Sequence, residues 1–400
     1  MKKIIIIVTG VILGLITLYF LKTSLFSKKT NNISPIKPRV EKTAYNFLLL
    51  GYGGGIHEGT FLTDTIMIAH IDTKLKKTTL FSIPRDLWVK LPTKSKTDFH
   101  KKINAVYQIG LFPKDYPDLD KKYISAVDDA KLIKTVIFQI TGLPIDGYVS
   151  VNFEGFTKAI DILGGIDVNI ERSFTDPEYP IDGKEKDLCD KDTEELFKKA
   201  EPFISPGFNP EERDRQFKDN PKLEEFVKNA TDSPELAFPC RYEKLEFQKG
   251  ITHMDGTIAL KYARSRHSPT DGGDFNRARH QQQIIEAVKN KVLSIGFVSK
   301  IIPLIGEFKK DVKTDIGLDI IKKFIGQADK TKEYKITPFV LTDQNVLKDA
   351  ISNDKQYVLI PSGGIDNWKG IQKIINNTIK EIKPIPTASP SAKIKQSITP

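Results

Sequence analysis

The chain has 400 residues, enough for one large or two medium domains with a substantial core. Its 61 Lys and Arg outnumber its 51 Asp and Glu, and the net charge of +10 favours an anionic partner such as nucleic acid, anionic lipid or a phosphorylated glycan. The sequence has no zinc-finger spacing and no aromatic RNA-binding motif, which disfavours nucleic acid, and two cysteines are too few for a cysteine-based zinc site.

The N-terminus carries an almost uninterrupted apolar run over residues 4–21, flanked by lysines. A helix of this length reaches about 27 Å, enough to span a bilayer core. No small-residue cleavage pattern follows it. We therefore predict a short cytoplasmic end and transmembrane anchor over residues 1–22 and a polar tether over residues 23–42. The bulk of the chain is then extracytoplasmic and attached to the cell membrane by a single pass.

Three apolar segments, residues 46–51, 65–71 and 78–83, have the composition of strands. The polar residues 72–77 between the last two predict a β-hairpin.

Helical and extended patterns then alternate. Residues 126–140 and 153–163 have helical spacing, and each segment is followed by glycine. Residues 148–151 and 166–170 read as strands. This alternation predicts a layered α/β domain.

Residues 174–241 are rich in charged residues and proline, and we interpret them as a surface insertion with short helical patches at 193–200 and 222–229. Its two cysteines, Cys189 and Cys240, are either a disulfide, as an oxidising compartment would allow, or two unrelated thiols. Core-like sequence resumes at residue 242. The remaining predicted elements are helices over residues 274–293, 297–308, 314–328 and 368–382, a strand over 334–341 and a disordered tail over 384–400.

Arginines and glutamines gather in residues 262–283, in and just before the predicted helix that Asp274 would cap. Arg277 and Gln281 are four residues apart and share one helix face. Guanidinium groups bind phosphate in a bidentate way, so Arg264, Arg266 and Arg277 predict a phosphate clamp. The alternative is a solvated basic face.

Further polar residues lie at the ends of predicted strands, where sites gather in open α/β sheets. Arg85 and Lys102 could converge with the other arginines on a pyrophosphate, and the carboxylate of Asp64 could hold a divalent metal. The alternative for each residue is an ordinary surface ion pair.

The glycine-rich residues 51–55 are not a phosphate-binding P-loop, because no Gly-Lys-Ser/Thr follows. His57 and Glu58, directly after them, are candidate metal ligands or a base. Neither a Ser-His-Asp nor a Cys-His nucleophile pattern is apparent.

Nine short motifs together indicate a resemblance to a known protein family. They occur in one order between about residues 45 and 295, and they are NFLLLG (46–51), TDTIM (63–67), SIPRD (82–86), KINA (102–105), VNFEGF (151–156), LGGIDV (163–168), MDG (254–256), YARSRH (262–267) and GDFNRARHQQQ (273–283). In this set the chain resembles the LytR-CpsA-Psr family of cell-wall phosphotransferases. The region after about residue 310 is similar to C-terminal extensions of some members.

The resemblance implies an α/β/α sandwich with a mixed central sheet and an apolar pocket for a prenyl chain. It also implies transfer of a glycopolymer from a polyprenyl-pyrophosphate carrier to peptidoglycan, assisted by Mg²⁺. The expected domains are a catalytic domain over residues 43–310, which includes the insertion, and an α/β extension over residues 311–383.

By motif position, the residues expected to bind the pyrophosphate are Arg85, Lys102, Arg264, Arg266, Arg277 and Gln281. Asp64 is expected to be the catalytic or metal-binding carboxylate. Arg85 and Arg266 are expected to be catalytic as well.

The chain departs from the family pattern at Gly53, where an Asp is usual, and at Leu62, where an Arg is usual. His280 also stands where an Arg is common. His57 or Glu58 could substitute for the missing carboxylate. The departures leave two rival hypotheses open, a non-catalytic envelope protein that binds polyprenyl lipid and a lipid pyrophosphate hydrolase. A transcription attenuator fits poorly with an external domain.

Overall fold

The computed structural model describes residues 42–55, 59–204, 210–294, 311–325 and 334–380. The predicted anchor, tether, tail and helix 297–308 lie outside these residues. Within them, no helix combines the length and apolarity needed to cross a membrane. The chain divides into two compact units, the first made of Met1–Asn169, Thr252–Ala263 and Ala278–Pro400, and the second of Ile170–Ile251 and Arg264–Arg277.

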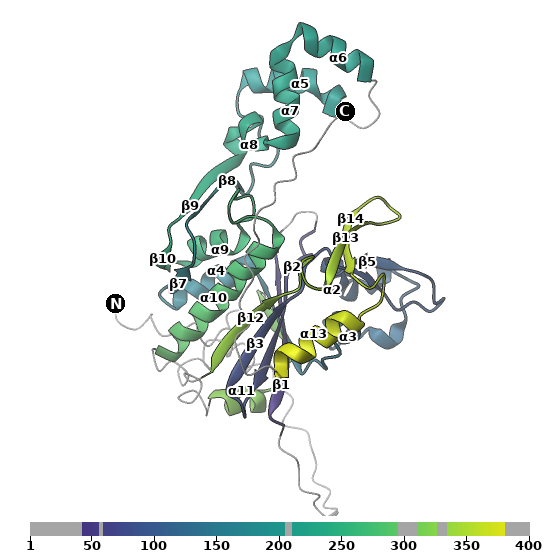
Figure 1. Ribbon diagram of the computed structural model, residues 1–400, viewed down its shortest axis with the longest axis vertical. Helices are drawn as coiled ribbons and strands as arrows, with labels where there is room; N and C mark the ends of the chain where they lie inside the picture. Colours follow the sequence, from purple (N-terminus) through teal and green to yellow (C-terminus); the bar gives the residue numbers. More distant parts are fainter. Residues whose placement is uncertain (1–41, 56–58, 205–209, 295–310, 326–333, 381–400) are drawn as a thin grey trace, which may run out of the picture. The chain divides into compact units, whose positions relative to one another are not determined.

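A six-stranded mixed sheet is the centre of the first unit (Figure 1). Its strands, in spatial order, are β11 (Val312–Thr314), β6 (Gly147–Asn152), β1 (Ala44–Tyr52), β2 (Thr63–Asp72), β3 (Lys77–Ser82) and β12 (Lys335–Val340). The pairs β1–β6 and β3–β12 are parallel, and the other three are antiparallel. The predicted hairpin is confirmed as β2–β3, and the predicted strands coincide with β1, β6 and β12.

Both faces of this sheet are covered, which explains the continuous apolar runs of its strands. Leu48, Ile68 and Phe81 stand opposite one another on neighbouring strands and are fully buried on one face. On the other face, Met67 and Leu80 belong to a cluster that includes Ile285 of helix α10 (Asp274–Ser294).

Helices flank the strands on two sides. In Figure 1, α10, α9 (Gly256–Arg264) and α4 (Phe153–Ile162) lie on one side of the strands. On the other side lie α2 (Asn104–Leu111), α3 (Lys131–Thr141) and α13 (Lys369–Lys380). The other elements of this unit include α11 (Leu318–Ile325), short 3₁₀ helices at Pro113–Asp115 and Lys121–Tyr123, and the strand pairs β4 (Trp88–Lys90) with β5 (His100–Lys102), β13 (Leu347–Ile351) with β14 (Tyr357–Pro361) and β7 (Ile166–Ile170) with β10 (Gly250–Met254).

The second unit contains a two-stranded sheet of β8 (Phe174–Pro180) and β9 (Tyr242–Phe247) and a set of helices between them. The helices are α5 (Lys191–Ile204), α6 (Pro210–Asp219), α7 (Pro221–Asp232), α8 (Pro234–Ala237) and a 3₁₀ turn at Pro239–Arg241. The helical patches predicted within this segment lie in α5 and α7. Its buried residues include Leu223, Phe226 and Phe238. Cys189 and Cys240 form a disulfide, which decides between the two alternatives left open by the sequence.

Two predicted helices start too early. The helix expected over residues 126–140 begins only at Lys131, because Ser125 and Asp128 accept hydrogen bonds from the backbone N–H groups that follow them and hold a turn there. Its end is correct, at Gly142 in the left-handed conformation with φ 72°. The helix expected from residue 314 begins at Leu318, because Thr314 pairs with β6 as part of β11.

Candidate functional site

A chain of four charged side chains lies at one end of the β2–β3 hairpin. Asp64 is the second residue of β2 and Arg85 follows β3, and the antiparallel pairing brings these ends together. Arg85 Nη1 donates to Asp64 Oδ1 at 2.8 Å, and its Nε lies 3.6 Å from Asp86 Oδ2. Lys102 Nζ at the end of β5 donates to Asp86 Oδ1 at 2.6 Å. We call these four residues the strand-end cluster.

Backbone hydrogen bonds fix the loops that carry the strand-end cluster. Asn104 N donates to Arg85 O at 3.2 Å, and Ile103 N donates to Leu87 O at 2.8 Å. Thr63 Oγ1 donates to Asn104 O at 3.1 Å. The starts of β2 and α2 and the loop after β3 are therefore tied together, which limits how far the charged groups can move.

The strand-end cluster has the chemistry of an anion site that can also hold a metal. The side chains of Arg85 and Lys102 are 25% and 24% exposed, so a ligand can reach two cations that are held in place. Asp64, 39% exposed, and Asp86 supply carboxylate oxygens. Mg²⁺ usually binds through one or two carboxylates together with substrate phosphates, and Asp64, the more exposed of these two carboxylates, is a donor of that type.

The second unit organises the predicted arginine segment around Asp176, a fully buried carboxylate on β8. Its Oδ2 accepts from Ser265 Oγ at 2.6 Å and from the backbone N–H groups of Arg266 at 3.0 Å and His267 at 3.2 Å. Its Oδ1 accepts from Glu178 N at 3.1 Å. Asp176 therefore fixes the path of the backbone that carries Arg266.

The three predicted phosphate-binding arginines, which belong to the second unit, each have local partners. Arg264 Nη1 donates to Tyr179 Oη at 3.1 Å and lies 3.4 Å from Asp182. Burial raises the pKa of Tyr179 to about 12, so its hydroxyl stays protonated at neutral pH. Arg266 Nε donates to the ring nitrogen Nε2 of His267 at 3.2 Å.

Arg277 is the most buried of the three arginines. Its side chain is 8% exposed and pairs with Asp274 at 3.2 Å on the first turn of α10. A guanidinium this deep keeps one orientation, which suits a fixed contact better than a mobile surface charge.

Two neighbouring glutamines of α10, Gln281 and Gln282, make different contacts. Gln281 Nε2 donates to Ala263 O at 3.2 Å, within the first unit. Gln282 is buried, and its Nε2 lies within 3.1 Å of Leu80 O, Ser82 Oγ and Phe339 O, so it ties α10 to β3 and β12.

The structure thus brings Asp64, Arg85 and Lys102 into one cluster. It places Arg264, Arg266 and Arg277 in the second compact unit and Gln281 in the first. The two proposed substitutes for the missing carboxylate, His57 and Glu58, lie outside the described residues.

Sequence reasoning missed Asp176 as a residue of these sites. A signal for Asp176 was present, because it shares the inward face of its strand with Phe174 two residues earlier. An acidic residue at an inward position of a strand needs hydrogen-bond donors around it. Asp86 lies in the SIPRD motif, but its contacts with both Arg85 and Lys102 depend on the loop that carries Lys102 and were not readable from the sequence.

Comparison with known proteins gives a family. The model of the LytR_cpsA_psr family matches residues 18–373, most of the chain. A polyisoprenyl-teichoic acid–peptidoglycan teichoic acid transferase TagU of Enterococcus faecalis is 24% identical over 286 residues, which are 70% of this chain and 65% of the relative. The corresponding TagV of Bacillus subtilis is 27% identical over 259 residues, 64% of this chain and 45% of the relative. The chain thus spans about half to two thirds of the length of these relatives.

A solved structure shares the fold. A protein of Streptococcus agalactiae superimposes with a TM-score of 0.52 at 18% identity, covering 86% of this chain and 91% of that one. At this identity the similarity concerns the fold alone.

Proposed function

Because the chain belongs to the LytR_cpsA_psr family, we propose that it transfers a glycopolymer from a polyprenyl-pyrophosphate carrier to peptidoglycan. The observation that carries the proposal is the strand-end cluster, in which Asp64, Arg85 and Lys102 meet through Asp86. The two fixed cations, Arg85 and Lys102, suit the negative charge of a pyrophosphate, and the neighbouring carboxylates suit a metal ion bound to it. The relatives named as teichoic acid transferases support the same reaction.

The reaction follows from these groups. A hydroxyl of peptidoglycan attacks the phosphorus next to the sugar, a new P–O bond forms, and the bridging P–O bond of the pyrophosphate breaks. Polyprenyl phosphate leaves with that electron pair, and Asp64 is our candidate to accept the hydroxyl proton. Arg85 and Lys102 stabilise the charge that develops on the leaving phosphate. The alternative role of Asp64 is to hold Mg²⁺, which would neutralise phosphate oxygens.

We propose that three arginines of the second unit also bind phosphate. Arg264, Arg266 and Arg277 are guanidinium groups suited to bidentate contacts with phosphate oxygens. Asp176 positions the backbone of Arg266 without needing to touch substrate. Gln281 of the first unit, which already donates to Ala263 O, would bind phosphate through its side-chain amide.

The proposed location is outside the cytoplasmic membrane, with residues 1–22 as the anchor. The disulfide between Cys189 and Cys240 supports this location, because such bonds persist in oxidising compartments and are rare in the cytosol.

The test is transfer of labelled glycan from a polyprenyl-pyrophosphate oligosaccharide to peptidoglycan fragments by the purified full chain with Mg²⁺. Arg85→Ala should slow transfer about 100- to 1,000-fold, the usual cost of removing one preorganised donor. Arg213→Ala is the matched control, since Arg213 is exposed on α6 and pairs with its neighbour Asp214. It should transfer at the unchanged rate.

The products separate the rival functions. Labelled glycan released free in solution would identify a lipid pyrophosphate hydrolase. Binding of the lipid without any product would identify a non-catalytic binder. The absence of the usual Asp at Gly53 and of the usual Arg at Leu62 would then account for the missing activity. Transfer that survives in Arg85→Ala would refute the assigned site.

A further inference from the structure

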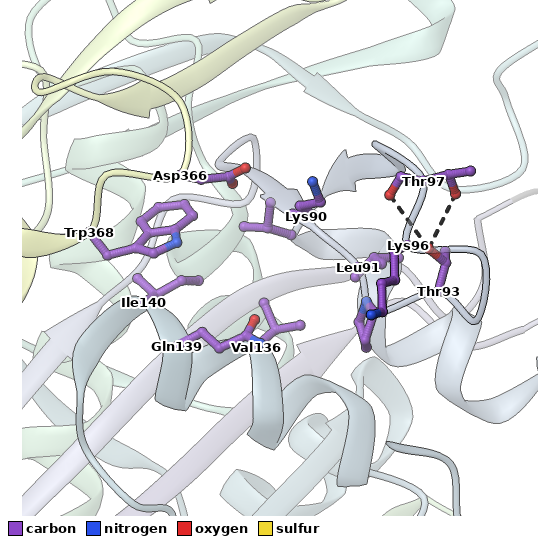
Figure 2. A pocket seen from close by; sticks show the side chains of 12 residues that line it. Lys90, Leu91, Thr93, Lys96, Thr97, Val136, Gln139, Ile140, Asp366 and Trp368 are labelled. Carbon is purple, nitrogen blue, oxygen red and sulfur yellow. Dashed lines mark hydrogen bonds between the residues drawn. The ribbon is translucent and has the colours of Figure 1, made fainter. Parts of the chain in front are cut away.

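A pocket of about 580 Å³ opens beside the β4–β5 ribbon, within the first unit (Figure 2). This volume is in the range of roughly 300–1,000 Å³ typical of ligand pockets. On one side, Trp368 and Asp366 come from the loop before α13, and on the opposite side lie Thr93, Lys96 and Thr97. The part of α3 that carries Val136, Gln139 and Ile140 lines it between them.

The pocket combines an apolar interior with polar groups at its edges. Val89, Leu91, Val136 and Ile140 are buried side chains that line it. The half-buried indole of Trp368 adds an aromatic surface. The carboxylate of Asp366 and the exposed amide of Gln139 provide hydrogen-bonding groups, as do the hydroxyls of Thr93 and Thr97.

The polar groups nearest Trp368 are held in place. Asp366 has a positive φ of 60°, and its carboxylate oxygens lie 3.0 and 3.2 Å from Nε2 of His100. The His100 ring stacks on Trp88 at 5.9 Å, and its Nδ1 faces Asp98 at 3.4 Å. A ring held between two carboxylates and an indole fixes where Asp366 can offer its oxygens.

Asp98, His100 and Asp366 also have the residue types of a metal site, with ligand atoms within 4.8 Å of one another. The ammonium of Lys90, however, lies 2.9 Å from Asp98 Oδ1 and already supplies a positive charge there. We therefore interpret Asp98 and His100 as supports for Asp366, which lines the pocket, rather than as a cation site.

From this arrangement we propose that the pocket is a saccharide subsite, in which a sugar ring stacks on Trp368. A sugar has an apolar C–H face and a rim of hydroxyls, which match an indole surrounded by a carboxylate, an amide and hydroxyls. A prenyl chain would remove water from the exposed amide of Gln139 and the carboxylate of Asp366 without offering a hydrogen bond in return, at a cost in free energy. The subsite rests on the proposed function, because the glycopolymer and the peptidoglycan of that reaction are the glycans that would bind here.

The position of the pocket along the ribbon supports this occupant. Lys102 of the strand-end cluster pairs with Trp88, and two residues further along each strand His100 pairs with Lys90. At about 3.3 Å per residue, Lys90, which lines the pocket, lies roughly 7 Å along the ribbon from the Trp88–Lys102 pair. A sugar next to the reacting phosphate lies at a comparable distance, so the strand-end cluster and the pocket can serve one glycan.

The test measures binding of a β-1,4-linked tetramer of N-acetylglucosamine to the purified full chain by calorimetry. Trp368→Ala should weaken binding at least tenfold, and Trp368→Tyr, which keeps an aromatic ring, should restore most of it. Gln139→Ala removes only an exposed lining side chain and should weaken binding about threefold without risk to folding. Phe138→Ala, an exposed aromatic on the same helix that does not line the pocket, should bind as the wild type does.

A second readout uses the chain's two tryptophans. In Trp88→Phe only Trp368 remains, and its fluorescence should change saturably with the tetramer. In the transfer assay, Trp368→Ala should raise KM with little change in kcat. A rise in KM for peptidoglycan assigns the subsite to the acceptor, and a rise for the lipid-linked oligosaccharide assigns it to the donor.

Failure of the subsite and failure of the proposed function give different results. Tetramer binding that depends on Trp368, without any transfer, would uphold the subsite and refute the transferase. Arg85-dependent transfer with no tetramer binding, or with equal binding in Trp368→Ala, would overturn the subsite alone. Displacement of the tetramer from Trp368 by polyprenyl phosphate would show that the pocket belongs to the lipid.

Discussion

The two compact units are stabilised in different ways. The first buries aliphatic side chains on both faces of a six-stranded sheet, such as Leu48 on one face and Leu80 on the other. The second has only a two-stranded sheet, and it relies on packed rings such as Phe226 and Phe238, 5.4 Å apart, and on a disulfide. A smaller core supplies less burial, so a cross-link and a few polar anchors carry more of its stability.

The charged residues of the two units are also held in different ways. In the first unit, Arg85 and Lys102 are held by other side chains, Asp64 and Asp86, through ion pairs that are partly exposed. In the second, Asp176 holds the backbone of the arginine segment from a fully buried position. Partly exposed ion pairs contribute little to stability, whereas a buried carboxylate that accepts several backbone hydrogen bonds is costly to remove.

Removing the disulfide should give the largest effect and should affect the two units most differently. The variant with both Cys189→Ser and Cys240→Ser should lose about 4 kcal/mol in the second unit, since the bond closes a loop with a sequence separation of 51. Hydrogen exchange followed by mass spectrometry should show faster exchange in α5 and α7 and unchanged exchange in β1 and β2. Equal loss in both units would mean that they unfold as one.

Removing the buried carboxylate of Asp176 should have the second largest effect. Asp176→Ala leaves the N–H groups of Arg266 and His267 and the hydroxyl of Ser265 without their acceptor, which should destabilise the second unit by about 3 kcal/mol. Denaturant unfolding measures the loss. Asp182→Ala is the control, because Asp182 is a largely exposed partner of Arg264, and it should cost under about 1 kcal/mol. Similar costs for both variants would contradict the anchoring role.

A change in the strand-end cluster should instead affect the reaction more than stability. Lys102→Ala should slow transfer about 100-fold by removing a cation from the leaving phosphate, with unfolding shifted by under about 1 kcal/mol. Lys101 is the matched control. It is the neighbour of Lys102 on β5, and the Nζ of Lys101 lies over the Phe99 ring, 5.5 Å from the ring centroid. Lys101→Ala should transfer normally, and an equal loss in both would argue for a nonspecific charge effect.

The smallest expected effect concerns pH and the core of the first unit. His70 is buried, its Nδ1 contacts Asn46 Oδ1 at 2.7 Å, and burial lowers its pKa from 6.5. The unfolded chain therefore binds a proton first as the pH falls, and stability should drop below about pH 6.5 until the folded-state pKa is reached. The loss should be about 1.4 kcal/mol for each unit by which the pKa is lowered.

Unfolding measured between pH 5 and 8 in the wild type and His70→Gln checks this. The variant should lose the additional slope on acidification, while His253→Gln, which removes an exposed histidine paired with Asp167, should keep it. An identical slope in the wild type and His70→Gln would show that His70 does not titrate with folding.

The sequence predicted most of the local structure and part of the site. Strands β1 to β3 and helices α4 and α10 were readable because their patterns of buried residues repeat over short distances. Asp64, Arg85 and Lys102 were readable as candidates because they lie in motifs beside those elements. The early starts assigned to α3 and α11 show the limit of this reading, since turn-forming side chains and a strand pairing overrode the helical pattern there.

What the sequence determined by itself is therefore the set of local elements, the family motifs and the types of residue available for phosphate chemistry. Only the tertiary structure decided which distant residues meet. It paired β12 with β3, joined Cys189 to Cys240, placed Asp176 under the arginine segment and set Asp366 against His100, 266 residues away in sequence. Backbone periodicity reports only which face of an element is buried, whereas the partner across that face is selected by the packing of the whole chain.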